Sequence, residues 1–141
     1  EGSAVLYNAW KACTEEIKPV EATTLADSIS VGIPRDRIKA LRAVRETDGE
    51  YTIVSDDEIL DAMRVLARNA AVFGEPAGVT GFAGLQKMLR EGRICSDEKI
   101  VVLVTGNGLK DVASAIKATG KPHLIDPTMG DLRKLMRVLN T

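Results

Sequence analysis

The segment with the strongest potential for ligand binding is a glycine-containing turn that follows an apolar run. Residues 100–104 read IVVLV, which is typical of a strand buried on both faces of a parallel sheet, and Thr105, Gly106, Asn107 and Gly108 follow. Ligands of open α/β sheets bind beyond the carboxyl ends of central strands, where glycines let backbone N–H groups approach them. The turn is therefore a candidate site. Gly106 and Gly108 could equally shape a tight strand–helix connection, because a lone GxG completes neither the dinucleotide fingerprint nor the phosphate loop.

A second candidate group is the carboxylate of Glu75, which lies between an apolar helix end and a proline turn. A buried carboxylate at this place could serve a function, but the local pattern by itself is more typical of a solvated loop acid. The helix that follows, residues 78–90, contains Gly78, Gly81 and Gly84. Because each glycine costs about 1 kcal/mol relative to alanine in a helix, we expect close backbone packing to compensate.

The other polar candidates are explained by ordinary structural roles. Lys110 and Asp111 could form an active pair, but such a pair is more typical of an exposed first helical turn, and His123 has no partner cluster. Cys13 and Cys95 lack CxxC spacing, so we predict no metal site and no disulfide framework. Reduced thiols of a cytoplasmic protein are the expected state of both cysteines.

Helix and strand patterns alternate along the elements that must position these residues. Strands are predicted at residues 51–54 and 100–104, and Ser55 with Glu58 forms a capping box at a helix start. Apolar residues at helical spacing predict helices at residues 3–15, 35–47, 55–71, 78–90 and 108–119 and after residue 127. This alternation predicts an α/β fold, a partial three-layer α/β/α arrangement with a mostly parallel sheet. The small number of strands suggests that part of a domain is absent.

Composition narrows the possible classes of protein. The chain has 141 residues, 45% of them hydrophobic and 28% charged, which predicts a globular domain. A formal net charge of -1, with acids and bases interleaved, argues against a nucleic-acid partner. No apolar run approaches the roughly 20 residues that span a bilayer, so no membrane association is expected.

Several segments together resemble the fold-type II pyridoxal phosphate (PLP) enzymes, threonine synthases in particular. Residues 105–111 read TGNGLKD, which is similar to the TG[HN]GLKD pattern of that family. Residues 72–77 (VFGEPA) resemble its GIF-x-EPA segment, and residues 81–85 (GFAGL) the helix after it. Residues 24–34 (TLADSISVGIP) resemble its TLATAIRIGNP segment. The similarity covers roughly residues 1–119, and TGNGLKD is its specific part.

The resemblance implies a PLP site and a role for four residues in it. Thr105 matches the hydroxyl residue that hydrogen-bonds the pyridine nitrogen, with Gly106 beside it, and Ser28 matches the small residue packed on the ring face. Glu75 matches an acid near the cofactor pocket. A neutral hydroxyl at the nitrogen moderates the electron sink, which suits β,γ-replacement or elimination. The implied reaction converts O-phosphohomoserine and water to threonine and phosphate.

The same resemblance implies that catalysis needs more than this chain. The family's Schiff-base lysine and phosphate-binding loop precede the matched region, so no catalytic residue is assigned here and a missing N-terminal half is an expected partner. Residues 1–120 would form the C-terminal part of the large domain, and residues 121–141 a helical tail. A small amino-acid substrate, a homo-oligomer and a cytoplasmic location are also expected.

Two alternative functions remain open from the sequence. Ser28 replaces the usual alanine, and residues 24–31 (TLADSISV) lean toward the TIADGIAV-like run of threonine and serine dehydratases. The chain could also be a non-catalytic interaction or oligomerisation domain. That role predicts an exposed apolar patch larger than a few hundred Å².

Overall fold

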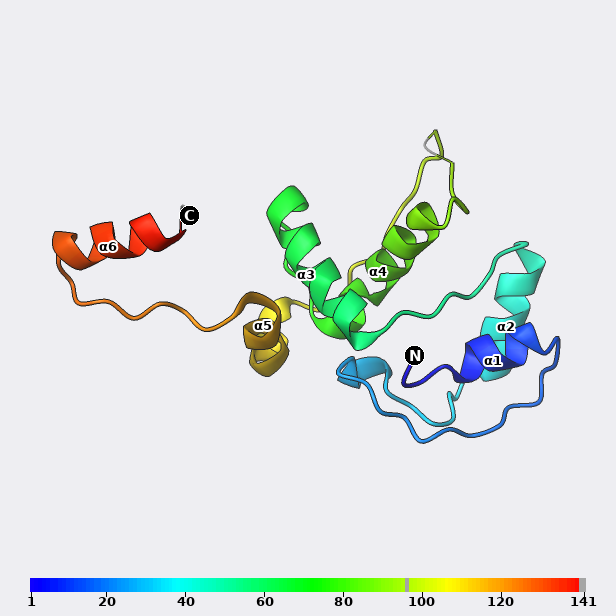
Figure 1. The fold of residues 1–141 in the computed structure, drawn as a ribbon. Coiled ribbons are helices and arrows are strands. Elements are labelled where there is room, and N and C mark those ends of the chain that lie inside the picture. Colours follow the sequence, from blue (N-terminus) through cyan, green and yellow to red (C-terminus); the bar gives the residue numbers. More distant parts are fainter. Residues whose placement is uncertain (96, 140–141) are drawn as a thin grey trace.

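The computed structural model describes residues 1–95 and 97–139 as helices joined by irregular segments (Figure 1). Two short 3-10 helices, η1 (Asp27–Ile29) and η2 (Gly108–Lys110), lie on either side of the central helices in the sequence. The α-helices of the described residues are α1 (Val5–Lys11), α2 (Arg37–Glu46), α3 (Asp56–Ala70), α4 (Pro76–Arg90), α5 (Val112–Thr119) and α6 (Met129–Leu139).

The expected α/β fold, a partial three-layer arrangement with a mostly parallel sheet, is wrong for the described residues. Residues 51–54 and 100–104 are non-helical, as predicted, but neither forms a strand. Across the described ranges, β pairing is limited to an isolated antiparallel bridge between Gly74 and Asn107. A strand requires a neighbouring extended segment that supplies its hydrogen-bond partners. Here the carbonyl of Ile53 accepts a hydrogen bond from the Lys87 side chain instead (2.8 Å).

The predicted helices are present, and the corrections concern their ends. The first helix was expected over residues 3–15 but ends at Lys11, because Cys13 adopts a left-handed conformation (φ 51°). The helix expected from residue 78 begins two residues earlier, with Pro76 in its first turn. The helix expected over residues 108–119 is divided into η2 and α5, and Asp111 lies between them.

Helices α3 and α4 pack side by side and form the core (Figure 1). The buried cluster takes three residues from α3, two from α4 and three from other segments: Ile59, Ala62, Met63, Val79, Ala83, Ala26, Val54 and Ala118. Helices α1 and α2 pack against each other beside this core, and α6 lies apart from the other helices with no buried residue. Val79, near the start of α4, belongs to this core, so Glu75, which precedes the helix, lies next to the core.

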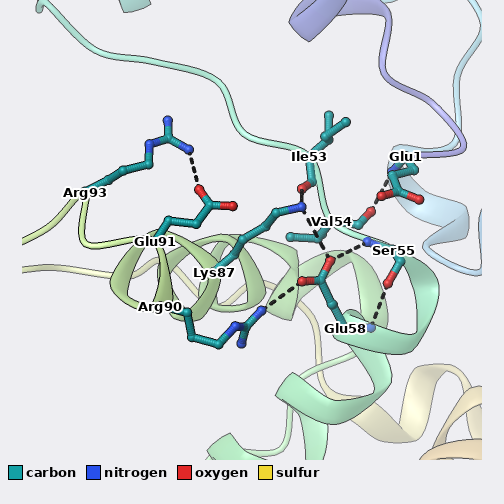
Figure 2. Close-up of polar contacts among 9 residues, drawn as sticks. All are labelled: Glu1, Ile53, Val54, Ser55, Glu58, Lys87, Arg90, Glu91 and Arg93. Atoms are coloured by element: carbon teal, nitrogen blue, oxygen red, sulfur yellow. Dashed lines mark hydrogen bonds and ion pairs between the residues drawn. The ribbon is translucent and has the colours of Figure 1, made fainter.

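A polar network joins α3 to α4 (Figure 2). Ser55 and Glu58 form the predicted capping box, in which the Glu58 amide donates to Ser55 Oγ (3.2 Å) and the Ser55 amide donates to the Glu58 carboxylate (2.9 Å). The same carboxylate accepts a hydrogen bond from Arg90 of α4 (2.8 Å), and Lys87 Nζ lies 3.8 Å from it. Lys87 belongs to α4, so its contacts hold both the start of α3 and the irregular segment at Ile53 against that helix.

Residues 100–104 pack on one side only, which corrects the prediction of a segment buried on both faces. Val104 contacts the buried core cluster, whereas Val101 and Leu103 are 90% and 82% exposed. The alternation of packed and exposed side chains is that of an extended segment with a single covered face.

Among the residues that the structure describes, no helix has both the length and the apolar character needed to cross a membrane.

Candidate functional site

The candidate site is built around the turn that links residues 100–104 to α5. Gly106 has φ 72°, a conformation that favours glycine, and its carbonyl accepts a hydrogen bond from the Glu75 amide (3.2 Å). Two residues later the Gly108 amide donates to the Phe73 carbonyl (2.9 Å). The Asn107 side chain accepts from the Leu109 amide (2.9 Å) and starts η2. The bonds of Gly106 and Gly108 hold the turn against the segment that precedes α4.

Glu75 lies at the junction between this turn and α4. The residue is 7% exposed, and Lys110 Nζ of η2 donates to its carboxylate oxygen Oε1 at 3.3 Å. A Cβ added at Gly106 would lie only 1.9 Å from the same oxygen, which is too close for any side chain at that position. The pattern-based interpretation of Glu75 as a solvated loop acid is therefore wrong, because the carboxylate is buried and paired.

Close backbone packing brings α4 against Thr105. A Cβ added at Gly78 would lie 1.6 Å from the Thr105 carbonyl oxygen, so only glycine allows this approach. The expectation that helical glycines mark close packing is confirmed at Gly78. It is wrong at Gly81, where an added Cβ would meet no atom within 4 Å. Gly84 is intermediate, with Thr52 Cγ2 at 3.0 Å.

A cavity of about 460 Å³ brings part of the predicted site together. Ser28 of η1 and Glu75 line it, although they are far apart in the sequence. The other lining residues are Leu25, Asp27, Pro76, Ala77, Lys110 and Asp111. Thr105 and Gly106 do not line this cavity; both are exposed, and Gly106 adjoins it through the Glu75 carboxylate.

Lys110 and Asp111 are the site residues whose roles pattern reasoning missed. They were interpreted as an exposed first helical turn, and Lys110 is indeed exposed at the end of η2. The pattern did not indicate that Lys110 pairs with Glu75 or that the Asp111 side chain caps α5. Asp111 Oδ1 accepts a hydrogen bond from the Ser114 amide (2.9 Å). This bond holds the pKa of the Asp111 carboxyl below its ordinary value, and Lys117 acts in the same direction. The family pattern GLKD contains both residues and was the available signal.

The lowered pKa of Asp111 makes a prediction about pH. A carboxyl with a lower pKa in the folded state stabilises the fold above its unfolded pKa of roughly 3.9, and this stabilisation is lost as pH falls through the folded pKa. We expect Asp111→Asn, which keeps an oxygen that can accept from the Ser114 amide, to weaken the dependence of unfolding free energy on pH below about pH 4. Urea unfolding at a series of acidic pH values measures it. An unchanged slope would contradict the role of Asp111.

The cavity is large enough to hold a small molecule. A volume of about 460 Å³ lies in the range of small-molecule sites. The glycine at position 106 removes a side chain next to the buried carboxylate, and hydroxyls of Ser28 and Thr105 are on exposed residues nearby. These features fit the site that the resemblance to PLP enzymes implies, with a small residue for the ring face and a hydroxyl for the ring nitrogen. Within the described ranges, no group of three His, Cys, Asp or Glu side chains is placed to hold a metal ion.

The cavity lies between η1, the N-terminus of α4 and the residues that follow the glycine turn. Comparison with known proteins then gives the family. The profile described as "Pyridoxal-phosphate dependent enzyme" matches residues 1–106. The chain therefore belongs to the pyridoxal-phosphate dependent enzyme family.

Curated relatives of this chain carry the name threonine synthase. The protein of Methanocaldococcus jannaschii is 37% identical over 140 residues, which cover 99% of this chain and 35% of the relative. That of Methanosarcina acetivorans is 37% identical over 135 residues (95% and 33%), and that of a Bacillus species 41% over 98 residues (70% and 28%). The chain spans about a third of the length of these relatives and matches their C-terminal part. The dehydratase and non-catalytic alternatives are not favoured by these matches.

Proposed function

We propose that this chain forms the pyridine-nitrogen side of the PLP site in an enzyme with threonine synthase activity. The observation that carries the proposal is the meeting of Ser28 and Glu75 at one cavity, with Gly106 directly against the Glu75 carboxylate. These residues come from three segments that resemble one family, and the relatives named threonine synthase match the same region. The proposed reaction converts O-phosphohomoserine and water to threonine and phosphate.

Each site residue has a proposed role toward the cofactor. Thr105 would donate a hydrogen bond from its hydroxyl group to the ring nitrogen, Ser28 would pack on the ring face, and Gly106 would allow the backbone to approach the ring closely. Glu75 forms the polar wall beside the turn. PLP, when bound, supplies the electron sink that makes the substrate's carbon–hydrogen bonds acidic. A neutral hydroxyl at the nitrogen leaves the ring largely unprotonated, which restrains that sink.

The remaining groups of the active site are proposed to come from polypeptide equivalent to the two thirds of the relatives that this chain does not cover. The cofactor-linked lysine and the groups that bind the substrate phosphate belong to that portion. If so, PLP added to this chain alone should give no stoichiometric borohydride-trapped lysine adduct, as measured by mass spectrometry. A specific adduct on one lysine would show that the chain carries its own catalytic lysine.

A hybrid enzyme tests the proposed activity. The matching C-terminal third of the Methanocaldococcus jannaschii relative is replaced by this chain, which aligns over 140 residues. We expect the hybrid to release phosphate from O-phosphohomoserine and to form threonine. Thr105→Val in the hybrid should lower kcat about tenfold or more, because it removes the proposed hydrogen bond to the ring nitrogen of PLP. Valine keeps the shape of the threonine side chain, so the packing should not change.

The hybrid also separates the proposal from its alternatives. Thr128→Val, in the tail, serves as the matched control and should leave kcat unchanged. A folded hybrid that binds PLP and deaminates threonine, without using O-phosphohomoserine, would contradict the threonine synthase assignment. Equal activity of the Thr105→Val and parent hybrids would contradict the role of Thr105.

We also propose a homo-oligomeric, cytoplasmic protein in which residues 1–120 and the tail at 121–141 are separate units. Exposed apolar side chains support the oligomer, among them Val101 and Leu103 near the site and Leu124 in the tail. The position of α6, apart from the other helices, supports the division (Figure 1). Light scattering of the hybrid with and without residues 121–141 tests both points. A monomer in both forms would contradict the oligomer.

A further inference from the structure

We propose that Lys110 is a positioning residue that acts through Glu75 to fix the turn at residues 106–110 and, with it, Thr105. The proposed function assigns roles to Glu75 and Thr105 but none to Lys110. The inference about the turn stands on the contacts of this chain. Only its last step, that a fixed Thr105 serves the cofactor, rests on the proposed function.

The two ends of the turn are attached to the same residue. At the start, the Glu75 amide donates to the Gly106 carbonyl (3.2 Å). At the end, Lys110 Nζ donates to the Glu75 carboxylate (3.3 Å). One residue of the α4 N-terminus therefore holds both ends of a five-residue turn, through its backbone at one end and its side chain at the other.

The burial of Glu75 makes its ion pair with Lys110 important for the position of the Glu75 side chain. The Glu75 side chain is 10% exposed, whereas that of Lys110 is 61% exposed. A carboxylate buried without a charged partner is unfavourable, so loss of the ammonium favours movement of Glu75 toward solvent. The carboxylate oxygen touches Gly106, and its departure would leave the turn attached by backbone bonds alone.

The charges around the cavity favour this role for Lys110 over capture of an anion. Asp27, Glu75 and Asp111 line the cavity together with Lys110. Because Lys110 already has these carboxylates as neighbours, its charge is not free to hold a separate anion.

Thr105 is coupled to the turn from both sides. It precedes Gly106 directly, and its carbonyl oxygen lies against Gly78 of α4. When the turn is held by Glu75, α4 and the turn enclose the Thr105 backbone. When the turn is released, the Thr105 backbone loses this support.

Amide hydrogen exchange and methyl NMR of this chain, without cofactor, test the proposal. Lys110→Met should accelerate exchange of the Gly108 amide about tenfold and shift the Thr105 methyl signal, while amides of α3 and the Thr80 methyl signal stay unchanged. Lys110→Arg, which keeps the charge, should exchange within about twofold of the parent chain. Lys39→Met, on the exposed face of α2, is the matched control.

A double variant shows whether Lys110 acts through Glu75. In a Glu75→Gln background, Lys110→Met should cause no further acceleration, because the ion pair is already absent. The proposal is overturned if Lys110→Met leaves the Gly108 amide unaffected, if α3 amides accelerate equally, or if the two substitutions act additively. If Lys110→Met does not fold, the parent chain is measured in about 1 M salt, where the electrostatic screening length falls to about 3 Å. The salt should accelerate hydrogen exchange of the Gly108 amide, and no acceleration overturns the proposal. Because no PLP is present, these outcomes do not depend on the proposed function.

Discussion

Gly78→Ala is expected to destabilise the fold by about 3 kcal/mol, because overpacking against backbone cannot be relieved by rotating a side chain. The added Cβ would lie 1.6 Å from the Thr105 carbonyl oxygen and 2.7 Å from its carbonyl carbon. Relief therefore requires α4 to move away from Thr105. Urea unfolding followed by circular dichroism measures the change in the free energy of unfolding.

Gly81→Ala is the matched control on the same helix. An alanine Cβ at position 81 meets no atom within 4 Å, and alanine is the better helix former by up to about 1 kcal/mol. The control should therefore be neutral or more stable than the parent chain. If both substitutions change stability by the same amount, the contact between Gly78 and Thr105 does not exist in solution.

The helices were largely predictable because their signals are local. Ser55 and Glu58 stand three residues apart, and the structure confirms their capping box at the start of α3. Gly120 ends α5 as expected, with φ 82°. The early end of α1 was missed because Cys13 takes a left-handed conformation that cysteine rarely adopts.

The sheet was not predictable because pairing depends on segments distant in the sequence. Residues 100–104 have the apolar, β-branched composition of a strand, and their backbone is non-helical as that composition predicts. Composition cannot show whether another extended segment lies beside them. Exposure of Val101 and Leu103 shows that one face is left uncovered within the described residues.

The site was predictable in its turn and less so in its contacts. Gly106 was identified by its residue type, and its positive φ confirms why glycine is needed there. The pairing of Glu75 with Lys110 joins residues 35 positions apart, and no local pattern indicates it. The roles of Thr105, Gly106, Ser28 and Glu75 in cofactor binding stay predictions.

The second large effect is expected at Gly106, where two costs act together. Gly106→Ala places a non-glycine residue at φ 72°, which costs about 1–2 kcal/mol. The new Cβ would also lie 1.9 Å from Glu75 Oε1, 2.4 Å from Cδ and 2.8 Å from Cγ. Because three atoms of that side chain are too close, the whole Glu75 side chain must leave its buried position, which breaks the pair with Lys110.

Gly92→Ala is a control that separates the effect of the backbone conformation from the effect of the contact with Glu75. Gly92 has φ 67°, close to that of Gly106, but a Cβ there meets no atom within 4 Å. We expect Gly92→Ala to lower the free energy of unfolding by about 1–2 kcal/mol and Gly106→Ala by about 3 kcal/mol or more, as measured by urea unfolding. Loss of the Glu75 pair adds a second signature, because Lys110→Met should then have little further effect in the Gly106→Ala chain. Equal losses at positions 92 and 106 would mean that Glu75 does not lie against Gly106, and the geometry proposed for the cofactor side of the turn would fail with it.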